Sequence, residues 1–210
     1  MNENAPPMIL CVGRNYQQHI KEMNARREEE PVIFMKQPRS YNESSKIFIP
    51  EVLGTLHYEV ELAVLIGREL KNASEDESEA AIEGYGVAID FTLRELQTGF
   101  KNKGLPWELS KAFDNSAPCG RFIKKEAFSD NPQNCDISLS VNGKTVQSSN
   151  TAQMLFKPSE IISYASRFIT IPEGTILLTG TPEGVGPAFH EDQFEAKTGT
   201  AMHRFTLLRK

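Results

Sequence analysis

Acidic side chains stand two residues apart at the start of a hydrophobic stretch, at Glu59 and Glu61. Residues 57–67 become aliphatic and β-branched toward Gly67, a composition that predicts a β-strand with a buried end. Because side chains alternate along a strand, both carboxylates project from one face. Two buried carboxylates this close would repel each other, so we expect a cationic group between them.

A third carboxylate, Asp90, ends another apolar stretch over residues 86–90. Glu59 and Glu61 alone would also suit a solvated strand face, and the third acid is what favours a binding site. Three carboxylates that converge on one point form an oxygen-only site, which suits Mg²⁺, Mn²⁺ or Ca²⁺ better than zinc. The sequence therefore predicts a divalent-metal site made of these three residues.

A histidine and a glutamate stand three residues apart near the N-terminus, at His19 and Glu22. On a helical turn this spacing places both side chains on one face. The charged run 24–30 that follows has little to bury, so we expect residues 19–30 to form a mobile lid that orders when a ligand binds. A solvated surface helix with an incidental histidine is the alternative.

Polar residues downstream of Asp90 recur at helical spacing. Asp90, Arg94 and Gln97 stand at i, i+4 and i+7, so a helix over residues 90–97 would carry them on one stripe. Lys111 follows later, in the segment of small residues 110–114. An exposed helix face and an exposed loop lysine are the alternatives to a functional role.

The glycine-rich segment 180–187 follows a predicted strand over residues 175–179. It contains no Lys-Ser/Thr pair and no evident helix comes after it, so it is not a phosphate-binding P-loop. Its backbone N–H groups and the hydroxyl of Thr181 could instead bind a carboxylate.

The composition is typical of an ordinary soluble globular protein. The chain has 210 residues, 39% hydrophobic and 24% charged, which is enough for one domain with a core. The net charge of −5 argues against a nucleic-acid partner, and no apolar run is long enough for a membrane helix. Three widely spaced cysteines and the absence of a signal-peptide pattern favour a reducing, cytoplasmic location.

Strands outnumber helices in the expected secondary structure. The alternating stretch 137–144 contains an Asn-Gly pair typical of a hairpin turn. Ser74 opens a capping box for a helix that runs to about Glu83, and a second helix is expected over residues 161–168 with a buried face that includes Phe168. We expect one strand-rich α+β domain over residues 1–210, with residues 1–7 as a flexible N-terminus.

Taken in order, these segments resemble the fumarylacetoacetate hydrolase superfamily, in its single-domain branch of acylpyruvases and oxaloacetate decarboxylases. The resemblance covers nearly the whole chain after the first few residues. Each motif is weak alone, but the ordered set is highly specific. The family usually has proline after the lysine that matches Lys36, whereas Gln37 stands there in this chain. The matching motifs are VGRNY at 12–16, HIKEM at 19–23, HYEVEL at 57–62, DFTLRELQ at 90–97, KGLPW at 103–107, SKAF at 110–113 and LTGTPEGVG at 178–186.

The resemblance implies a mixed β-sandwich roll of the fumarylacetoacetate hydrolase C-terminal-domain type, usually as a homodimer. It implies Mg²⁺ or Mn²⁺, with Ca²⁺ as an inactive occupant, bound by the acidic residues identified above. The implied roles are metal ligation by Glu59, Glu61 and Asp90, catalysis by His19, Glu22 and Lys111, and substrate binding by Arg14, Lys36, Arg94, Gln97 and Thr181.

These residues suit hydrolysis of an acylpyruvate, such as fumarylpyruvate or acetylpyruvate, to pyruvate and a carboxylic acid. His19, oriented by Glu22, would take a proton from the attacking water, and the metal with Lys111 and Gln97 would stabilise the pyruvate enolate. Decarboxylation or keto–enol tautomerisation of oxaloacetate uses the same enolate and is the alternative. A cupin-like or non-catalytic metal-binding protein is a more remote alternative. The expected partner is a small 2-oxo acid.

Overall fold

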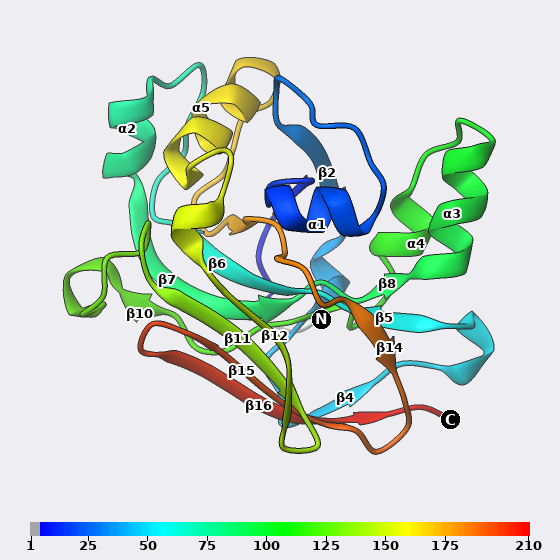
Figure 1. The fold of residues 1–210 in the computed structure, drawn as a ribbon. Helices are drawn as coiled ribbons and strands as arrows, with labels where there is room; N and C mark the ends of the chain where they lie inside the picture. The colour runs from blue at the N-terminus through cyan, green and yellow to red at the C-terminus, as the bar shows by residue number, and fades with distance from the viewer. Residues whose placement is uncertain (1–4) are drawn as a thin grey trace.

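A computed structural model describes residues 5–210, and its largest unit is a six-stranded mixed sheet (Figure 1). Within this sheet one pair of neighbouring strands, β1 and β13, is parallel and the other pairs are antiparallel. The strand order is β10 (Ile123–Lys124), β7 (Ile82–Ile89), β6 (Val60–Ile66), β13 (Ile176–Leu178), β1 (Ile9–Gly13) and β2 (Val32–Lys36).

A five-stranded sheet lies below the first one in the view of Figure 1. Its β11 and β12 join through the predicted Asn-Gly turn, in which Asn142 and Gly143 both have positive φ. The strand order is β12 (Lys144–Asn150), β11 (Asp136–Val141), β15 (Gln193–Thr198), β16 (Ala201–Leu208) and β4 (Lys46–Phe48). Two small sheets comprise β14 (Gly186–Ala188) with β5 (Leu56–Tyr58) and β8 (Thr92–Leu93), and β3 (Tyr41–Asn42) with β9 (Ala117–Pro118).

Short helices connect and cover the sheets. The α-helices are α1 (Gln17–Glu22), α2 (Glu75–Ala80), α3 (Arg94–Asn102), α4 (Glu108–Lys111) and α5 (Pro158–Phe168). The 3₁₀ turns are η1 (Pro38–Ser40), η2 (Glu51–Leu53), η3 (Lys125–Ala127) and η4 (Thr151–Gln153). The chain is therefore a strand-rich α+β protein, as the sequence predicted.

Two apolar clusters hold these layers together. One lies between the six-stranded sheet and α5, where Leu62 of β6 and Leu177 of β13 pack with Ile161. The other lies between the two large sheets, where Ile89 of β7 packs with Leu139 of β11. Because β6 is an interior strand buried almost throughout, any charged side chain that it carries is withdrawn from water.

Some expected boundaries are wrong, and pairing between strands explains why. The strand expected over residues 57–67 breaks at Glu59, because β5 pairs within a small sheet while β6 pairs with β7 and β13. The capping box at Ser74 is confirmed, but the helix ends at Ala80 since β7 begins at Ile82. Phe168, expected in the core, is 69% exposed at the end of α5.

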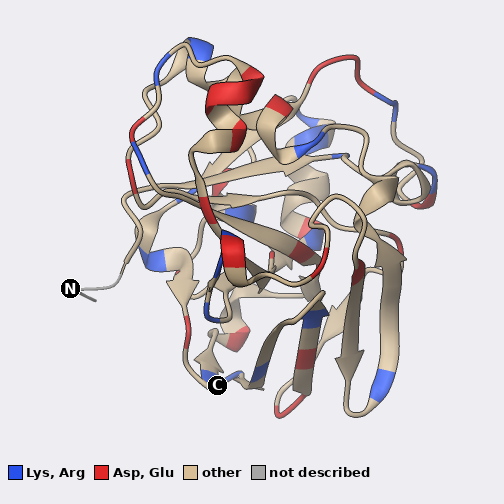
Figure 2. Cartoon of the chain, turned by 90° about the vertical axis from the view of Figure 1, so that its left-hand side faces the viewer, with Lys and Arg blue, Asp and Glu red and all other residues tan. Residues whose placement is uncertain are grey.

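The expected flexible N-terminus over residues 1–7 lies in part outside the described residues, which begin at Ala5; the next residue, Pro6, is buried. Acidic and basic residues are interspersed over the cartoon in Figure 2. Within the described part of the chain, no helix combines the length and the apolar character needed to cross a membrane.

Candidate active site

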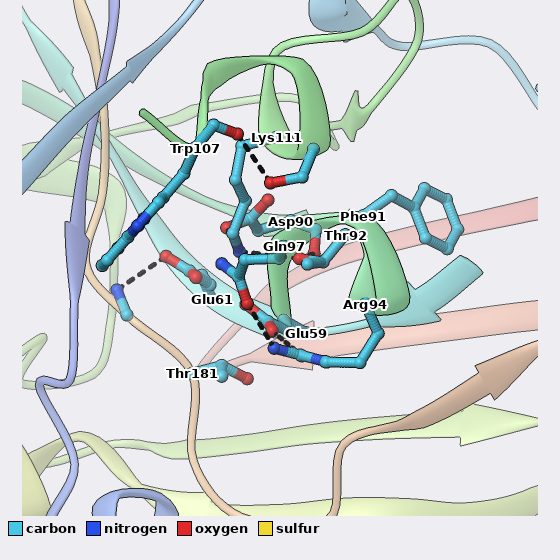
Figure 3. Close-up of polar contacts among 12 residues, drawn as sticks. Glu59, Glu61, Asp90, Phe91, Thr92, Arg94, Gln97, Trp107, Lys111 and Thr181 are labelled. Atoms are coloured by element: carbon cyan, nitrogen blue, oxygen red, sulfur yellow. Dashed lines mark hydrogen bonds and ion pairs between the residues drawn. The ribbon is translucent and has the colours of Figure 1, made fainter. Parts of the chain in front are cut away.

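Three carboxylates converge where β6 begins and β7 ends. Glu59 lies in the break between β5 and β6, Glu61 lies in β6, and Asp90 directly follows β7. The Asp90 N–H donates to the Glu59 carbonyl at 2.7 Å, so backbone pairing brings the acids together. One oxygen of each carboxylate lies within 4.8 Å of the other two, and all three residues are buried (Figure 3). We call these residues the acidic triad.

Cations neutralise two members of the acidic triad. Lys111 Nζ, at the end of α4, donates to Glu59 Oε2 at 2.8 Å and to Asp90 Oδ2 at 2.5 Å, and Arg94 pairs with Glu59. Burial opposes ionisation of Glu59, but Lys111 and Arg94 outweigh it and hold the pKa of Glu59 below its usual range. Burial also disfavours the charged form of Lys111, yet its carboxylate neighbours raise the pKa of this ammonium. Lys111 is thus a fixed positive charge.

Glu61 has no such neutralisation. No ammonium or guanidinium within residues 5–210 pairs with it, and its Oε2 accepts the Gly180 N–H at 2.6 Å. Burial, with Asp90 and Glu59 nearby, raises the pKa of Glu61 well above its usual value. The cation expected between Glu59 and Glu61, Lys111, therefore lies between Glu59 and Asp90 instead.

One oxygen of Asp90 is held by an ion pair alone. Asp90 Oδ1 accepts no hydrogen bond, although Lys36 Nζ lies 2.8 Å from it. Three buried carboxylates that converge within 4.8 Å, one of them without a cationic partner among the described residues, form an oxygen-only site that fits a divalent cation such as Mg²⁺ or Mn²⁺. Such an ion would replace the proton that burial favours on Glu61. His57, which a cupin-like ligand set would require, is not part of this cluster.

Lys36 lies behind Asp90 with no exposed side-chain surface. Its Nζ donates to Ser116 Oγ at 2.9 Å and to the carbonyl oxygens of Phe91, Lys111 and Ser116. Lys36 is not among the residues that line the pocket. We therefore propose that Lys36 supports Asp90, in place of the substrate contact expected from the sequence.

The predicted histidine–glutamate pair lies on α1, next to the pocket. His19 Nδ1 is 2.9 Å from Glu22 Oε2, which confirms that the two side chains share a helical face. The other carboxylate oxygen of Glu22 accepts the Gly184 N–H at 3.0 Å and so connects α1 to the glycine-rich loop. With Nδ1 held by a carboxylate, Nε2 is the ring nitrogen left for proton transfer in the pocket that His19 lines.

Four of the five expected substrate-binding residues line this pocket, namely Arg14, Arg94, Gln97 and Thr181. Arg14 has a left-handed backbone conformation, with φ of 60°, and its guanidinium pairs at 2.6 Å with Glu28 in the segment after α1. Thr181 is buried and belongs to the glycine-rich loop.

The helical stripe expected from Asp90 to Gln97 is wrong in its first part. Asp90 directly follows β7, the short strand β8 occupies Thr92–Leu93, and α3 begins only at Arg94. Arg94 Nη1 donates to Gln97 Oε1 at 2.9 Å, so these two side chains do share a helical face. Asp90 reaches the same pocket through tertiary structure, from the end of a strand.

Gln147 is a site residue that the sequence did not reveal. It lies on β12 with 1% exposure, and its Nε2 donates to Thr181 Oγ1 at 2.9 Å and to the Pro182 carbonyl at 2.9 Å. Its Oε1 accepts the N–H of Val60, between the two glutamates of the acidic triad, at 2.9 Å. Because the amide occupies the Thr181 oxygen as an acceptor, the hydroxyl proton is available for the pocket. No local pattern distinguishes Gln147 from other strand residues.

We expect Gln147→Glu to raise the KM for a 2-oxo acid by roughly tenfold, the scale of one lost hydrogen bond to a charged group. The carboxylate would accept the Thr181 proton and turn this donor away from the pocket. Steady-state kinetics with the exposed neighbour variant Ser148→Ala as control would measure the effect. A lower melting temperature with unchanged KM would mean that Gln147 only anchors the loop.

The fold and the site define the class of protein. Residues 8–205 match the family described as fumarylacetoacetate (FAA) hydrolase C-terminal, and the chain belongs to that family of enzymes. This confirms the resemblance and the fold class expected from the sequence.

The chain is 48% identical over 186 residues to the oxaloacetate tautomerase YcgM of Escherichia coli, covering 88% of this chain and 85% of that protein. It is 42% identical over 189 residues to the mitochondrial oxaloacetate tautomerase of Homo sapiens, covering 90% of this chain and 85% of that protein. A solved fumarylpyruvate hydrolase from Pseudomonas aeruginosa, in complex with Mn²⁺ and pyruvate, has a TM-score of 0.91 at 32% identity, covering 98% of this chain and 91% of that one. A solved fumarylacetoacetate hydrolase family protein from Yersinia pestis has a TM-score of 0.92 at 46% identity. The match covers 96% of this chain and 93% of that one.

Proposed function

We propose that this enzyme is a divalent-metal-dependent oxaloacetate tautomerase, which interconverts the keto and enol forms. Two relatives at 48% and 42% identity bear that name, so this alternative has more support than the acylpyruvate hydrolysis that the sequence placed first. The observation that carries the proposal is one pocket lined by His19, Lys111 and the acidic triad. A base next to a fixed positive charge is the arrangement that enolisation of a 2-oxo acid requires.

The proposed chemistry assigns a role to each group. Mg²⁺ or Mn²⁺ held by the acidic triad would supply a Lewis acid for the oxygens of the 2-oxo acid. His19 Nε2 would take the proton from the carbon next to the keto group, and Glu22 would stabilise the imidazolium. The electron pair of that C–H bond becomes the C=C bond, and the keto oxygen takes the negative charge and then the proton that the imidazolium gives back. Lys111 stabilises this charge, and Thr181 binds the neighbouring carboxylate.

The charge balance of the pocket suits a doubly charged substrate. The three carboxylates of the acidic triad are matched by three cations within the same cluster of ion pairs, Lys36, Arg94 and Lys111. When a divalent ion replaces the proton on Glu61, all three carboxylates are charged and balance these cations, so the two positive charges of the ion remain. The two carboxylates of oxaloacetate would neutralise them, which reduces the cost of burying charge.

Acylpyruvate hydrolysis is the second candidate, because a fumarylpyruvate hydrolase at 32% identity has a TM-score of 0.91 with this chain. The same His19 would then take its proton from water, and the bond that breaks would be a C–C bond. Decarboxylation of oxaloacetate would use the same enolate without an attacking water.

Activity assays on purified protein, stripped of metal and reloaded with Mg²⁺ or Mn²⁺, test which of these three reactions the enzyme catalyses best. We expect it to accelerate the loss of enol absorbance when enol-oxaloacetate is added, faster than it releases pyruvate from oxaloacetate or cleaves fumarylpyruvate. A metal-free sample is the control. Cleavage of fumarylpyruvate with no effect on oxaloacetate would instead identify the enzyme as an acylpyruvate hydrolase.

We also propose that the chain forms one catalytic domain with a lid over residues 19–30, and that it assembles as a homodimer. Support for the lid is that residues 24–30 are mostly exposed and lie outside the helices and strands, with side-chain contacts such as Arg14–Glu28 at 2.6 Å and the hydroxyl of Tyr164 to Glu30 at 3.2 Å. Light scattering should give about twice the chain mass of 23.5 kDa if the dimer forms.

A further inference from the structure

Lys101 differs from the other cations that line the pocket. Arg14, Arg94 and Lys111 each pair with a carboxylate of this chain. Among the lysines and arginines that line the pocket in the described chain, only Lys101 pairs with no carboxylate. Its side-chain hydrogen bond goes to the neutral Gln97 Oε1 at 3.1 Å. A positive charge without a protein counter-ion is thus directed at the space where a ligand binds.

The rings of Phe34 and Trp107 form an aromatic wall that fixes the position of Lys101 relative to the acidic triad. Lys111 Nζ lies 5.2 Å from the centre of the Phe34 ring, and Lys101 Nζ lies 4.7 Å from the centre of the Trp107 ring. The two ring centres are 6.4 Å apart. One ammonium therefore lies at the acidic triad, and the other lies further along the same wall. Lys101 is exposed overall yet lines the pocket, so it stands at the pocket mouth.

The electrostatic surroundings of Lys101 favour an anion. Partial burial of its ammonium, with Arg94 and Lys111 nearby, lowers the pKa of Lys101 to about 8. These neighbours repel the charged form, and a bound carboxylate would relieve that repulsion. The cation–π contact with Trp107 orients the ammonium without neutralising it.

We propose that Lys101 binds the distal carboxylate of a 2-oxo dicarboxylic acid and so selects dicarboxylates over 2-oxo acids with a neutral end. The inference rests on the proposed function, because it places the 2-oxo carboxylate at the acidic triad and Thr181. The second carboxylate then extends along the Phe34–Trp107 wall to Lys101. A charge-assisted hydrogen bond holds it there.

Binding of oxaloacetate and of pyruvate to the Mg²⁺-loaded protein tests this directly, since only oxaloacetate has the second carboxylate. Lys101→Met should weaken oxaloacetate binding about tenfold or more and leave pyruvate binding unchanged, the scale expected for one hydrogen bond between charged groups. Lys101→Arg should retain most of the affinity. Lys103→Met, at an exposed position outside the pocket lining, is the matched control.

Equal weakening of both ligands, or of neither, in Lys101→Met would overturn the proposal. Lys101→Gln provides a second neutral variant if the methionine variant does not fold, as judged by its melting curve. Binding isotherms keep this test separate from the proposed function. A wild-type protein that binds oxaloacetate through Lys101 but does not tautomerise it would refute the activity and support the subsite.

Discussion

Glu61→Gln is expected to weaken Mg²⁺ binding and to lower turnover of the 2-oxo acid by about 10²–10³-fold, because it removes an uncompensated charge from the metal site. The same change should raise the melting temperature of the metal-free protein. The pKa of Glu61 is raised in the fold, so at a pH above the ordinary glutamate pKa the metal-free protein must either bury this charge or take up a proton on folding, and both lower its stability. Glutamine keeps the size of the side chain and removes that cost, because it carries no charge and takes up no proton.

Glu59→Gln is the matched comparison, and it should have the opposite effect on stability. It also removes a metal ligand, so Mg²⁺ affinity and turnover should fall similarly. However, Glu59 pairs with Lys111 and Arg94, which would be left with one fewer buried partner. Breaking such a pair costs about 3–5 kcal/mol of unfolding free energy.

Calorimetric titration with Mg²⁺ and melting curves of both metal-free variants check this pair of expectations. Unchanged Mg²⁺ affinity in both variants would exclude the acidic triad as the metal site. If both variants raise the melting temperature, or both lower it, then Glu59 and Glu61 do not differ in charge neutralisation as the ion pairs indicate.

His19→Gln should lower turnover by about 10²–10⁴-fold, the usual range for loss of a general base, while Mg²⁺ affinity stays at the wild-type value. The reason is position: His19 lies on α1, bonded to Glu22, and the metal cluster contains only the acidic triad. A single substitution should therefore separate proton transfer from metal binding.

Steady-state rates and Mg²⁺ titration on one preparation would measure both quantities, with the exposed Gln18→Ala on the same helix as control. Wild-type turnover in His19→Gln would exclude the role as base. A parallel loss of Mg²⁺ affinity would instead place His19 in or against the metal site.

The sequence by itself determined the features that depend on local spacing. The two-residue spacing of Glu59 and Glu61 predicted that they share one cluster, which holds although the strand breaks at Glu59, and i, i+3 spacing paired His19 with Glu22. The Asn-Gly turn was equally local, since Asn and Gly tolerate the positive φ that this hairpin requires. The order of the motifs along the chain also indicated the family.

Tertiary structure decided which charges meet. Lys111 is separated by 52 positions from Glu59 and reaches the acidic triad only because α4 packs there, and Gln147 reaches Thr181 from another sheet. Lys36 faces Asp90 for the same reason, since β2 and its neighbours bury its side chain entirely. Contacts between distant segments depend on how sheets pair and pack, and no periodicity along the chain records that. The neutralised Glu59, the unneutralised Glu61 and the unpaired Lys101 are therefore properties of the folded chain.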